Sequence, residues 1–415
     1  MGLPFALSLQ TVSCGGLQRS FERGKERALC ERTNAIVGAT YCLTRTKDRA
    51  LFCGGKNEYG QVGVGGFSSR YDKPQRVPLD AVTSVSSSAF GTCAVGKGGL
   101  HCWGANWTGE LAQPTHGEAY TKSPIRLPAR VDLEGVTAVA TSTGHACAVT
   151  SRHEAYCWGT HGQWELGIGE GPRDPERCFS SFGEPFCDAP QRVPLDAVVQ
   201  IATGERYACA LTNDHAVYCW GRNNEGQLGV AGGKRHPDHD SDIAHSDIQR
   251  VELPRAIGIA AVSSTTCAVL ENHELRCWGT GFGSVPNAHG LTDPARFEKD
   301  VTLMADVESV AVANDHLCAV TTRGELFCLG SNEFGQLGLG GEWEKRSGCS
   351  VTRDKCPSRN EFTCRTPQKV LGERVVRVLV WPGFTIAERT DGTLLKWGGT
   401  HGHAYVDHPI PFAFE

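Results

Sequence analysis

A pair of cysteines about ten residues apart recurs six times along this chain, and this spacing constrains the fold more than any other feature. In one copy, Cys209 and Cys219 flank the polar sequence Asn213-Asp214-His215. If the cysteines face each other on adjacent antiparallel strands, these three residues form the hairpin loop, because Asn and Asp suit turn conformations. Opposed residues on such strands have Cβ atoms roughly 4.5–5.5 Å apart, close to the separation in a disulfide bond. Each copy therefore predicts a disulfide-linked β-hairpin.

The six hairpins share this arrangement with small differences in loop length. The predicted pairs are Cys42–Cys53, Cys93–Cys102, Cys147–Cys157, Cys209–Cys219, Cys267–Cys277 and Cys318–Cys328. The second hairpin is shorter because Lys97-Gly98 can form a two-residue turn. A seventh copy has Ile386 and Lys396 at the cysteine positions, so we expect a hairpin there without the disulfide.

Two further strand signals flank each hairpin. A β-branched run precedes the first cysteine, as at 82–85 and 198–201, and a proline-led segment follows a glycine-rich loop, as at 74–77 and 190–193. Proline donates no hydrogen bond to a sheet, so the proline-led strand belongs at the outer edge. Seven units of four strands predict an all-β, seven-bladed β-propeller with four-stranded antiparallel blades.

The repeat boundaries define one domain over residues 33–415, because a closed ring of repeats folds as a unit. The expected blades are 33–78, 79–128, 129–195, 196–254, 255–298, 299–371 and 372–412. Residues 15–32 are charged and are interpreted as a linker. Residues 1–14 form a short apolar segment that ends in Cys14, similar to a degenerate lipoprotein signal. Lipidation of Cys14 is one expectation, and an unstructured terminus is the alternative.

The glycine-rich loop carries a specific motif, Trp220-Gly-Arg-Asn223-Asn-Glu-Gly226-Gln-Leu-Gly229. In this pattern the chain resembles the regulator of chromosome condensation repeat family, over about residues 33–412. The resemblance implies a propeller. It also implies two activities known in that family: nucleotide exchange on small GTPases, and inhibition of β-lactamase by a secreted bacterial relative that uses loop aromatics. Blades five and seven depart from the motif, since neither contains Gly-Gln-Leu-Gly.

The cysteine content predicts a compartment. The chain has 19 cysteines, and disulfides persist outside the reducing cytosol. We therefore expect an extracytoplasmic protein, secreted or anchored on a bacterial cell surface, and no cytosolic GTPase as partner. The formal net charge of −5 disfavours nucleic acid. No apolar run reaches the length of a membrane-spanning helix.

Three insertions, 169–189, 231–247 and 341–365, fall at the same point of the repeat, between the glycine-rich loop and the outer strand. Equivalent loops of a propeller emerge on one face, so we expect a binding face there. Cys178 and Cys187 should close a local loop in the first insertion. For Cys349, Cys356 and Cys364, we expect two to pair with each other and the third to pair with Cys30.

The insertions also supply the candidate site residues. Exposed aromatic side chains often anchor protein interfaces, and the candidates here are Phe179, Phe182, Phe186 and Trp343. Tyr59, Phe334, Trp107 and Trp164 in the glycine-rich loops are further aromatic candidates, unless they pack between blades. A weak metal-ligand pattern comprises His236, Asp238, His239, Asp240, Asp242 and His245, although its spacing matches no standard metal loop. A solvated acidic loop is the preferred interpretation.

No recognised catalytic motif is present: the sequence lacks Gly-x-Ser-x-Gly, a P-loop and His-Glu-x-x-His. His145 and His316 precede blade cysteines and are interpreted as structural. We therefore expect a non-catalytic, monomeric scaffold without a cofactor, which binds a protein or surface polymer through its loop-rich face. The alternatives are a secreted enzyme inhibitor, a glycan- or peptide-processing enzyme with a site built from several blades, and, least favoured, a nucleotide-exchange factor.

Overall fold

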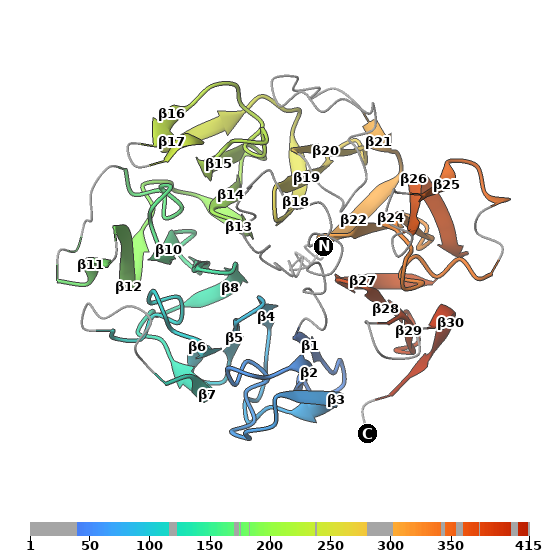
Figure 1. Ribbon diagram of the computed structural model, residues 1–415, viewed down its shortest axis with the longest axis horizontal. Coiled ribbons are helices and arrows are strands. Elements are labelled where there is room, and N and C mark those ends of the chain that lie inside the picture. Colours follow the sequence, from blue (N-terminus) through green and yellow to red (C-terminus); the bar gives the residue numbers. More distant parts are fainter. Residues whose placement is uncertain are drawn as a thin grey trace, which may run out of the picture.

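Seven β-sheets surround a common axis in the computed structural model, as Figure 1 shows. The structure describes residues 40–115, 123–169, 174, 176–181, 183–236, 239–279, 302–341, 345–353, 360–372, 374–399 and 406–413. The expected signal and linker, with Cys14 and Cys30, lie outside this part of the chain. The prediction of an all-β, seven-bladed propeller is confirmed. The described residues include no helix that is long and apolar enough to cross a membrane.

The strands follow the chain blade by blade. Blade one contains β1 (Tyr41–Thr44), β2 (Leu51–Lys56) and β3 (Arg70–Arg76). Blade two contains β4 (Ser84–Ser87), β5 (Gly91–Gly96), β6 (Gly99–Gly104) and β7 (Ile125–Arg130). Blade three contains β8 (Val136–Thr141), β9 (His145–Thr150), β10 (Ala155–Thr160), β11 (Cys178–Ser181) and β12 (Glu184–Arg192). Blade four contains β13 (Val198–Gly204), β14 (Tyr207–Thr212), β15 (Val217–Arg222), β16 (Lys234–His236) and β17 (His239–Val251).

The last three blades repeat this order. Blade five contains β18 (Ala256–Val262), β19 (Thr265–Leu270), β20 (Leu275–Gly279) and β21 (Thr302–Met304). Blade six contains β22 (Val307–Val312), β23 (His316–Thr321), β24 (Leu326–Ser331), β25 (Cys349–Arg353) and β26 (Asn360–Leu371). Blade seven contains β27 (Val375–Trp381), β28 (Phe384–Arg389), β29 (Leu394–Gly398) and β30 (Val406–Phe412). In Figure 1 the innermost strands, such as β13 and β18, lie closest to the axis.

The central hairpins have the register that the cysteine spacing predicts. Cys209 lies opposite Cys219, and Thr212 N donates to Ala216 O across the predicted three-residue loop (3.0 Å). The structure forms all six hairpin disulfides. In blade seven, Ile386 and Lys396 take the opposed positions. The Lys396 ammonium there lies over the Phe384 ring, 5.1 Å from its centroid, so a cation–π contact stands where the other blades have sulfur.

The insertions form strands rather than the loops that the sequence suggested. In blades three, four and six a fifth strand, β11, β16 or β25, pairs with the first part of the outer strand. Disulfides link Cys178 to Cys187 and Cys349 to Cys364. Both bonds cross these added hairpins between directly opposed residues. Cys356 lies outside the described residues. The proline-led strand is outermost, as predicted, in blades one and seven, where β3 contains Pro74 and β30 contains Pro409. The added hairpins extend the sheets of blades three, four and six.

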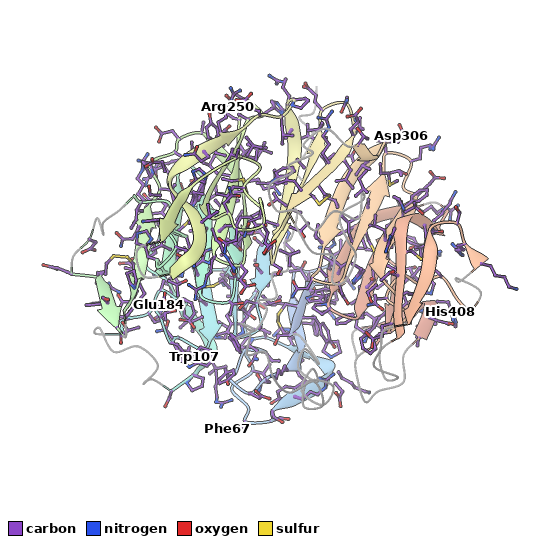
Figure 2. All side chains as sticks on the ribbon, turned by 45° about the horizontal axis from the view of Figure 1, so that its top comes forward. Phe67, Trp107, Glu184, Arg250, Asp306 and His408 are labelled. Carbon is purple, nitrogen blue, oxygen red and sulfur yellow. A yellow bond between two sulfur atoms is a disulfide. The ribbon has the colours of Figure 1, made fainter. Side chains whose placement is uncertain are left out.

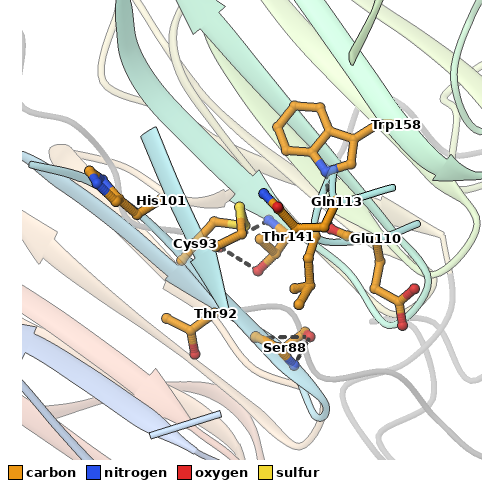
Figure 3. The surroundings of a disulfide bond; sticks show 12 residues. Ser88, Thr92, Cys93, His101, Glu110, Gln113, Thr141 and Trp158 are labelled. Carbon is orange, nitrogen blue, oxygen red and sulfur yellow. Dashed lines mark hydrogen bonds between the residues drawn. A yellow bond between two sulfur atoms is a disulfide. The ribbon is translucent and has the colours of Figure 1, made fainter. Parts of the chain in front are cut away.

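The core lies between neighbouring blades, and a repeated hydrogen bond fixes each blade to the previous one. A buried tryptophan donates its indole N–H to a carbonyl in the glycine-rich loop of the preceding blade. These bonds join Trp103 to Gln61, Trp158 to Glu110, Trp220 to Glu165, Trp278 to Gln227 and Trp397 to Gln336, at 2.9–3.0 Å. Figure 3 shows Glu110 and Trp158 beside Cys93, which belongs to the Cys93–Cys102 disulfide.

Two blades have no tryptophan for this bond. Leu329 takes the position in blade six and Gly54 in blade one. The preceding blades are five and seven, whose glycine-rich loops have neither Gln-Leu, Gln-Val nor Glu-Leu at the position that accepts the indole bond in the other blades. The departures from the repeat are therefore paired, because the indole and the loop form the two halves of one contact.

The hairpin turns on the opposite face provide a second connection between blades. His215 has a positive φ of 69°, and its carbonyl accepts a hydrogen bond from Ala256 N of the next blade (2.9 Å). Its Nδ1 also lies 2.9 Å from Ala256 O. His153 and His273 repeat this arrangement in blades three and five. In blades three, four and five, the loop at the end of the hairpin thus positions the following blade.

Candidate protein-binding face

One face of the ring carries the glycine-rich loops, the turns after the innermost strands and the added hairpins, because all of these connections leave the blades at the same end. The motif asparagine holds the loop in place in blades one, two, four and six. Asn223 Oδ1 accepts from Leu228 N (3.1 Å), and Asn223 Nδ2 donates to Val230 O (2.9 Å). Gln227 Oε1 accepts from Glu225 N (2.9 Å). These loops therefore have a fixed shape before any partner binds.

Three aromatic side chains meet on this face between blades one and two. Tyr59 and Trp107 come from the glycine-rich loops of the two blades, and Phe90 comes from the turn after β4. The Tyr59 ring centroid lies 4.9 Å from that of Trp107 and 5.6 Å from that of Phe90. The Phe90 and Trp107 centroids are 4.9 Å apart. All three side chains are half-buried, so the cluster packs internally and still presents ring surface to solvent.

An exposed phenylalanine extends this cluster outward. Phe67 is 85% exposed, and Leu127 on β7 is 50% exposed. The Arg126 guanidinium lies over the Phe67 ring, 4.7 Å from its centroid. Arg126 also donates to Gly66 O and to Glu58 O (both 3.3 Å), so it bridges the Phe67 loop and the residue before Tyr59. Figure 2 labels Phe67 and Trp107 in this region of the ring.

We call these residues the aromatic patch: Tyr59, Phe67, Phe90, Trp107, Arg126 and Leu127. The sequence pointed to Tyr59 and Trp107 but missed the others. A useful signal was available for Phe67, because a phenylalanine within the short polar sequence Gly65-Gly66-Phe67-Ser68-Ser69 has no strand partner to explain it.

Of the aromatic residues predicted from the insertions, Phe179 and Phe186 belong to β11 and β12 of blade three and are not part of the aromatic patch. Phe186 is 1% exposed and packs against Phe179, with ring centroids 5.7 Å apart. Its assignment to the binding face was wrong, because β12 lies between β10 and β11, where Phe186 and the two residues after it are all buried. Phe179 is half-buried beside it. Phe182 and Trp343 lie outside the described residues.

The candidate metal loop is only partly described. The side chains of His236, His239, Asp240 and Asp242 lie outside the described part, as does all of Asp238. His245 Nε2 lies 2.9 Å from Gly232 O, and burial lowers the pKa of His245. Among described residues, no group of three or more His, Cys, Asp and Glu side chains is placed to hold a metal ion.

One group of side chains has the residue types of a catalytic triad. His316 Nδ1 lies 2.8 Å from Asp315 Oδ1, and its Nε2 lies 2.8 Å from Thr385 Oγ1. Both His316 and Thr385 are 0% exposed, and Thr385 Oγ1 donates to Gln336 O (2.9 Å). A substrate cannot reach this hydroxyl. The group joins blades six and seven, which agrees with the structural interpretation of His316.

His145 occupies the equivalent position in blade three and is also buried. Its Nε2 has no hydrogen-bond partner within the described structure, because the residue that replaces Thr385 in the next blade is Ala208. Burial lowers the pKa of His145 to about 4, so the ring is neutral at neutral pH. His145 is therefore a buried structural histidine with one unsatisfied nitrogen.

Two buried carboxylates occupy a repeat position that is glutamine in three other blades. Glu110 and Glu165 stand where the other loops have Gln61, Gln227 and Gln336. Burial raises the pKa of Glu110 to about 7. Burial also raises the pKa of Glu165, although the positive charge of Arg206, 4.0 Å from Glu165 Oε1, opposes this effect. The loops of blades two and three thus contain acids that remain protonated at a higher pH than usual.

Family models for the regulator of chromosome condensation (RCC1) repeat match residues 50–95, 198–227, 214–269 and 307–336. Together with the propeller and its repeated tryptophan–loop contacts, these matches define the class: the chain is a propeller that contains RCC1 repeats.

Several known proteins are similar to this chain in sequence or in structure. The Ultraviolet-B receptor UVR8 of Arabidopsis thaliana is 29% identical over 387 residues, which span 90% of this chain and 78% of the receptor. The probable E3 ubiquitin-protein ligase HERC6 of Homo sapiens is 28% identical over 266 residues, 61% of this chain but only 24% of that protein. The structure of Prp20p from Saccharomyces cerevisiae has a TM-score of 0.68 and 18% identity, and the match covers 91% of this chain and 86% of Prp20p. This structural likeness supports the fold alone.

Proposed function

We propose that this protein is a non-catalytic, extracytoplasmic binding protein that engages a protein partner through the aromatic patch. The proposal depends on one observation. Phe67 is 85% exposed, and it lies beside a half-buried cluster of three aromatic rings on loops that internal hydrogen bonds hold in shape. Complete burial of one such side chain in an interface contributes about 1.5–3 kcal/mol. Aromatic residues and arginine, the components of this patch, are enriched among the residues that dominate binding energy.

The disulfides support the proposed location. Eight bonds occur in the described part of the chain, and such bonds form in oxidising compartments. We further propose that the protein is a monomer and that Cys14 carries a lipid anchor. Mass spectrometry of the amino terminus of the native protein tests the anchor, and an unmodified Cys14 would exclude it.

A protein partner is favoured over a surface polymer because the patch combines flat aromatic rings with aliphatic surface. Prp20p, which has the same fold, has binding properties toward Gsp1p and histones, so this fold can present a protein-binding surface. Inhibition of a secreted enzyme is a specific form of the same function, favoured by the aromatic residues on rigid loops. Inhibition assays with purified β-lactamases would test this form directly.

The experiment compares patch variants with a matched control. We expect Phe67→Ala and Trp107→Ala to weaken binding to the partner captured by crosslinking from the native envelope. Ile257→Ala is the control, because Ile257 is also exposed (37%) but lies on the inner strand β18 of blade five. If the patch variants and the control bind equally well, the proposed function is wrong. Turnover of glycoside or peptide substrates by the purified protein would contradict the non-catalytic assignment.

A further inference from the structure

We infer that the aromatic patch selects a protein segment in which a carboxylate stands next to an apolar side chain, and that Arg126 binds the carboxylate. This inference rests on the proposed function and specifies the chemistry of its partner. It depends on the charges around the patch rather than on its apolar area.

Described charged side chains of blade one, close in sequence to the patch residues, form ion pairs with each other. Lys56 Nζ lies 3.3 Å from Glu58 Oε2, and Arg70 Nε lies 2.7 Å from Asp72 Oδ1. Arg126 contacts Glu58 only through the Glu58 backbone carbonyl, and no carboxylate of the described residues forms an ion pair with its guanidinium. Among the described side chains, the Arg126 guanidinium is therefore a positive charge of the patch without an acidic partner.

A neighbouring arginine shows the usual arrangement. Arg130 lies four residues further along β7, and its Nη2 is 3.2 Å from Glu134 Oε1. Arg126 is on the same strand but faces aromatic rings and carbonyl groups. The comparison indicates that the unpaired guanidinium is specific to the patch and is not a general property of this strand.

Arg126 has N–H groups that can donate hydrogen bonds to a partner. A guanidinium has five N–H groups, and the two described hydrogen bonds, to Gly66 O and Glu58 O, account for two of them. These bonds and the Phe67 ring hold the guanidinium in one orientation, which reduces the entropy that binding must overcome. A carboxylate there would form charge-assisted hydrogen bonds. The side chain next to it in the partner would contact Phe67 and Leu127.

The test uses a random peptide library displayed on phage and the full, non-reduced chain as bait. We expect the selected peptides to be enriched in Asp or Glu next to an aromatic or aliphatic residue. Synthetic versions should bind at least tenfold more weakly to Arg126→Ala, the loss expected for a hydrogen-bonded charge pair. Their Asp→Asn or Glu→Gln counterparts should show a similar loss with the unchanged protein. Arg130→Ala is the matched control and should bind as tightly as wild type.

Arg126→Lys separates a binding role from a folding role. Lysine keeps the charge but not the planar fork, so partial affinity is expected, with thermal unfolding close to wild type. Selected peptides without acidic residues, or equal binding by wild type and Arg126→Ala, would overturn the inference while leaving the proposed function intact. Peptides whose binding is unaffected by Phe67→Ala and Trp107→Ala would overturn the proposed function as well. Failure to select any peptide also counts against the inference.

Discussion

Replacing Glu110 with glutamine should remove a pH dependence from the stability of the ring. In blade one, the equivalent Gln61 uses both ends of its amide: Oε1 accepts from Tyr59 N (2.9 Å), and Nε2 donates to Ala89 O (3.1 Å). Glu110 Oε2 accepts from Thr108 N (2.6 Å), but Glu110 Oε1 is buried without a hydrogen-bond partner in the described structure. Only a protonated Glu110 or a glutamine has a hydrogen to donate from that second position.

The magnitude follows from the pKa of Glu110. Burial raises it from 4.5 to about 7, and this difference corresponds to about 3 kcal/mol of unfolding free energy. Below pH 4.5, Glu110 is protonated in both the folded and the unfolded state, and its ionisation takes nothing from the stability of the protein. Between pH 4.5 and 7 the unfolded state loses its proton first, so stability falls as pH rises. Above pH 7 both states are ionised and the loss is complete.

Chemical unfolding of the non-reduced protein between pH 4 and 8.5 measures this effect. Glu110→Gln should be close to wild type at pH 4 and more stable by up to about 3 kcal/mol at pH 8. Glu134→Gln, which changes a carboxylate exposed on the surface, should leave the pH profile of the wild type unchanged. The reasoning is refuted if Glu110→Gln loses stability with rising pH as steeply as wild type does.

Three further changes test the architecture. Replacing Cys209 and Cys219 with alanine should lower the unfolding free energy by about 3 kcal/mol, and alkylation of the native wild-type protein without reductant should leave both positions unlabelled; labelling of both would contradict the bridge. Trp220→Phe removes the indole hydrogen bond to the preceding blade and should cost about 1–2 kcal/mol in chemical unfolding, and no measurable change would show that the bond adds nothing. Ile386→Cys combined with Lys396→Cys should form a seventh hairpin disulfide, because the two positions are directly opposed; two free thiols in the intact mass after alkylation would disprove the shared register.

Much of the fold could be predicted because the cysteine spacing in each repeat determines the strand register. The spacing of Cys209 and Cys219 determined which residues are opposed, and the turn residues between them agreed with that register. The extra strands were missed because insertions were treated as loops. Yet Cys349 and Cys364 are directly opposed residues on an added hairpin. A pair of cysteines therefore indicates two opposed strand positions in this insertion, as it does in the blades.

The candidate site was harder to predict, because it depends on which side chains different blades bring together. Tyr59 could be recognised as a loop aromatic, but its contact with Phe90 joins residues of neighbouring blades that no local pattern connects. Phe186 was misassigned for the opposite reason. It lies in an insertion, but that insertion forms β12, which is buried at Phe186 between β10 and β11.

The two blade interfaces without an indole hydrogen bond divide the circle unequally. Blades one to five form a continuous arc of four such bonds, and blades six and seven form a separate pair. Gly54 and Leu329 mark the two joints between these arcs. Under mechanical load or partial denaturation, neighbouring blades should therefore separate first at these two interfaces, between blades seven and one and between blades five and six. Amides of β1 and β22 would then exchange with deuterium earlier than those of β13, while every blade that has a disulfide keeps its own hairpin closed.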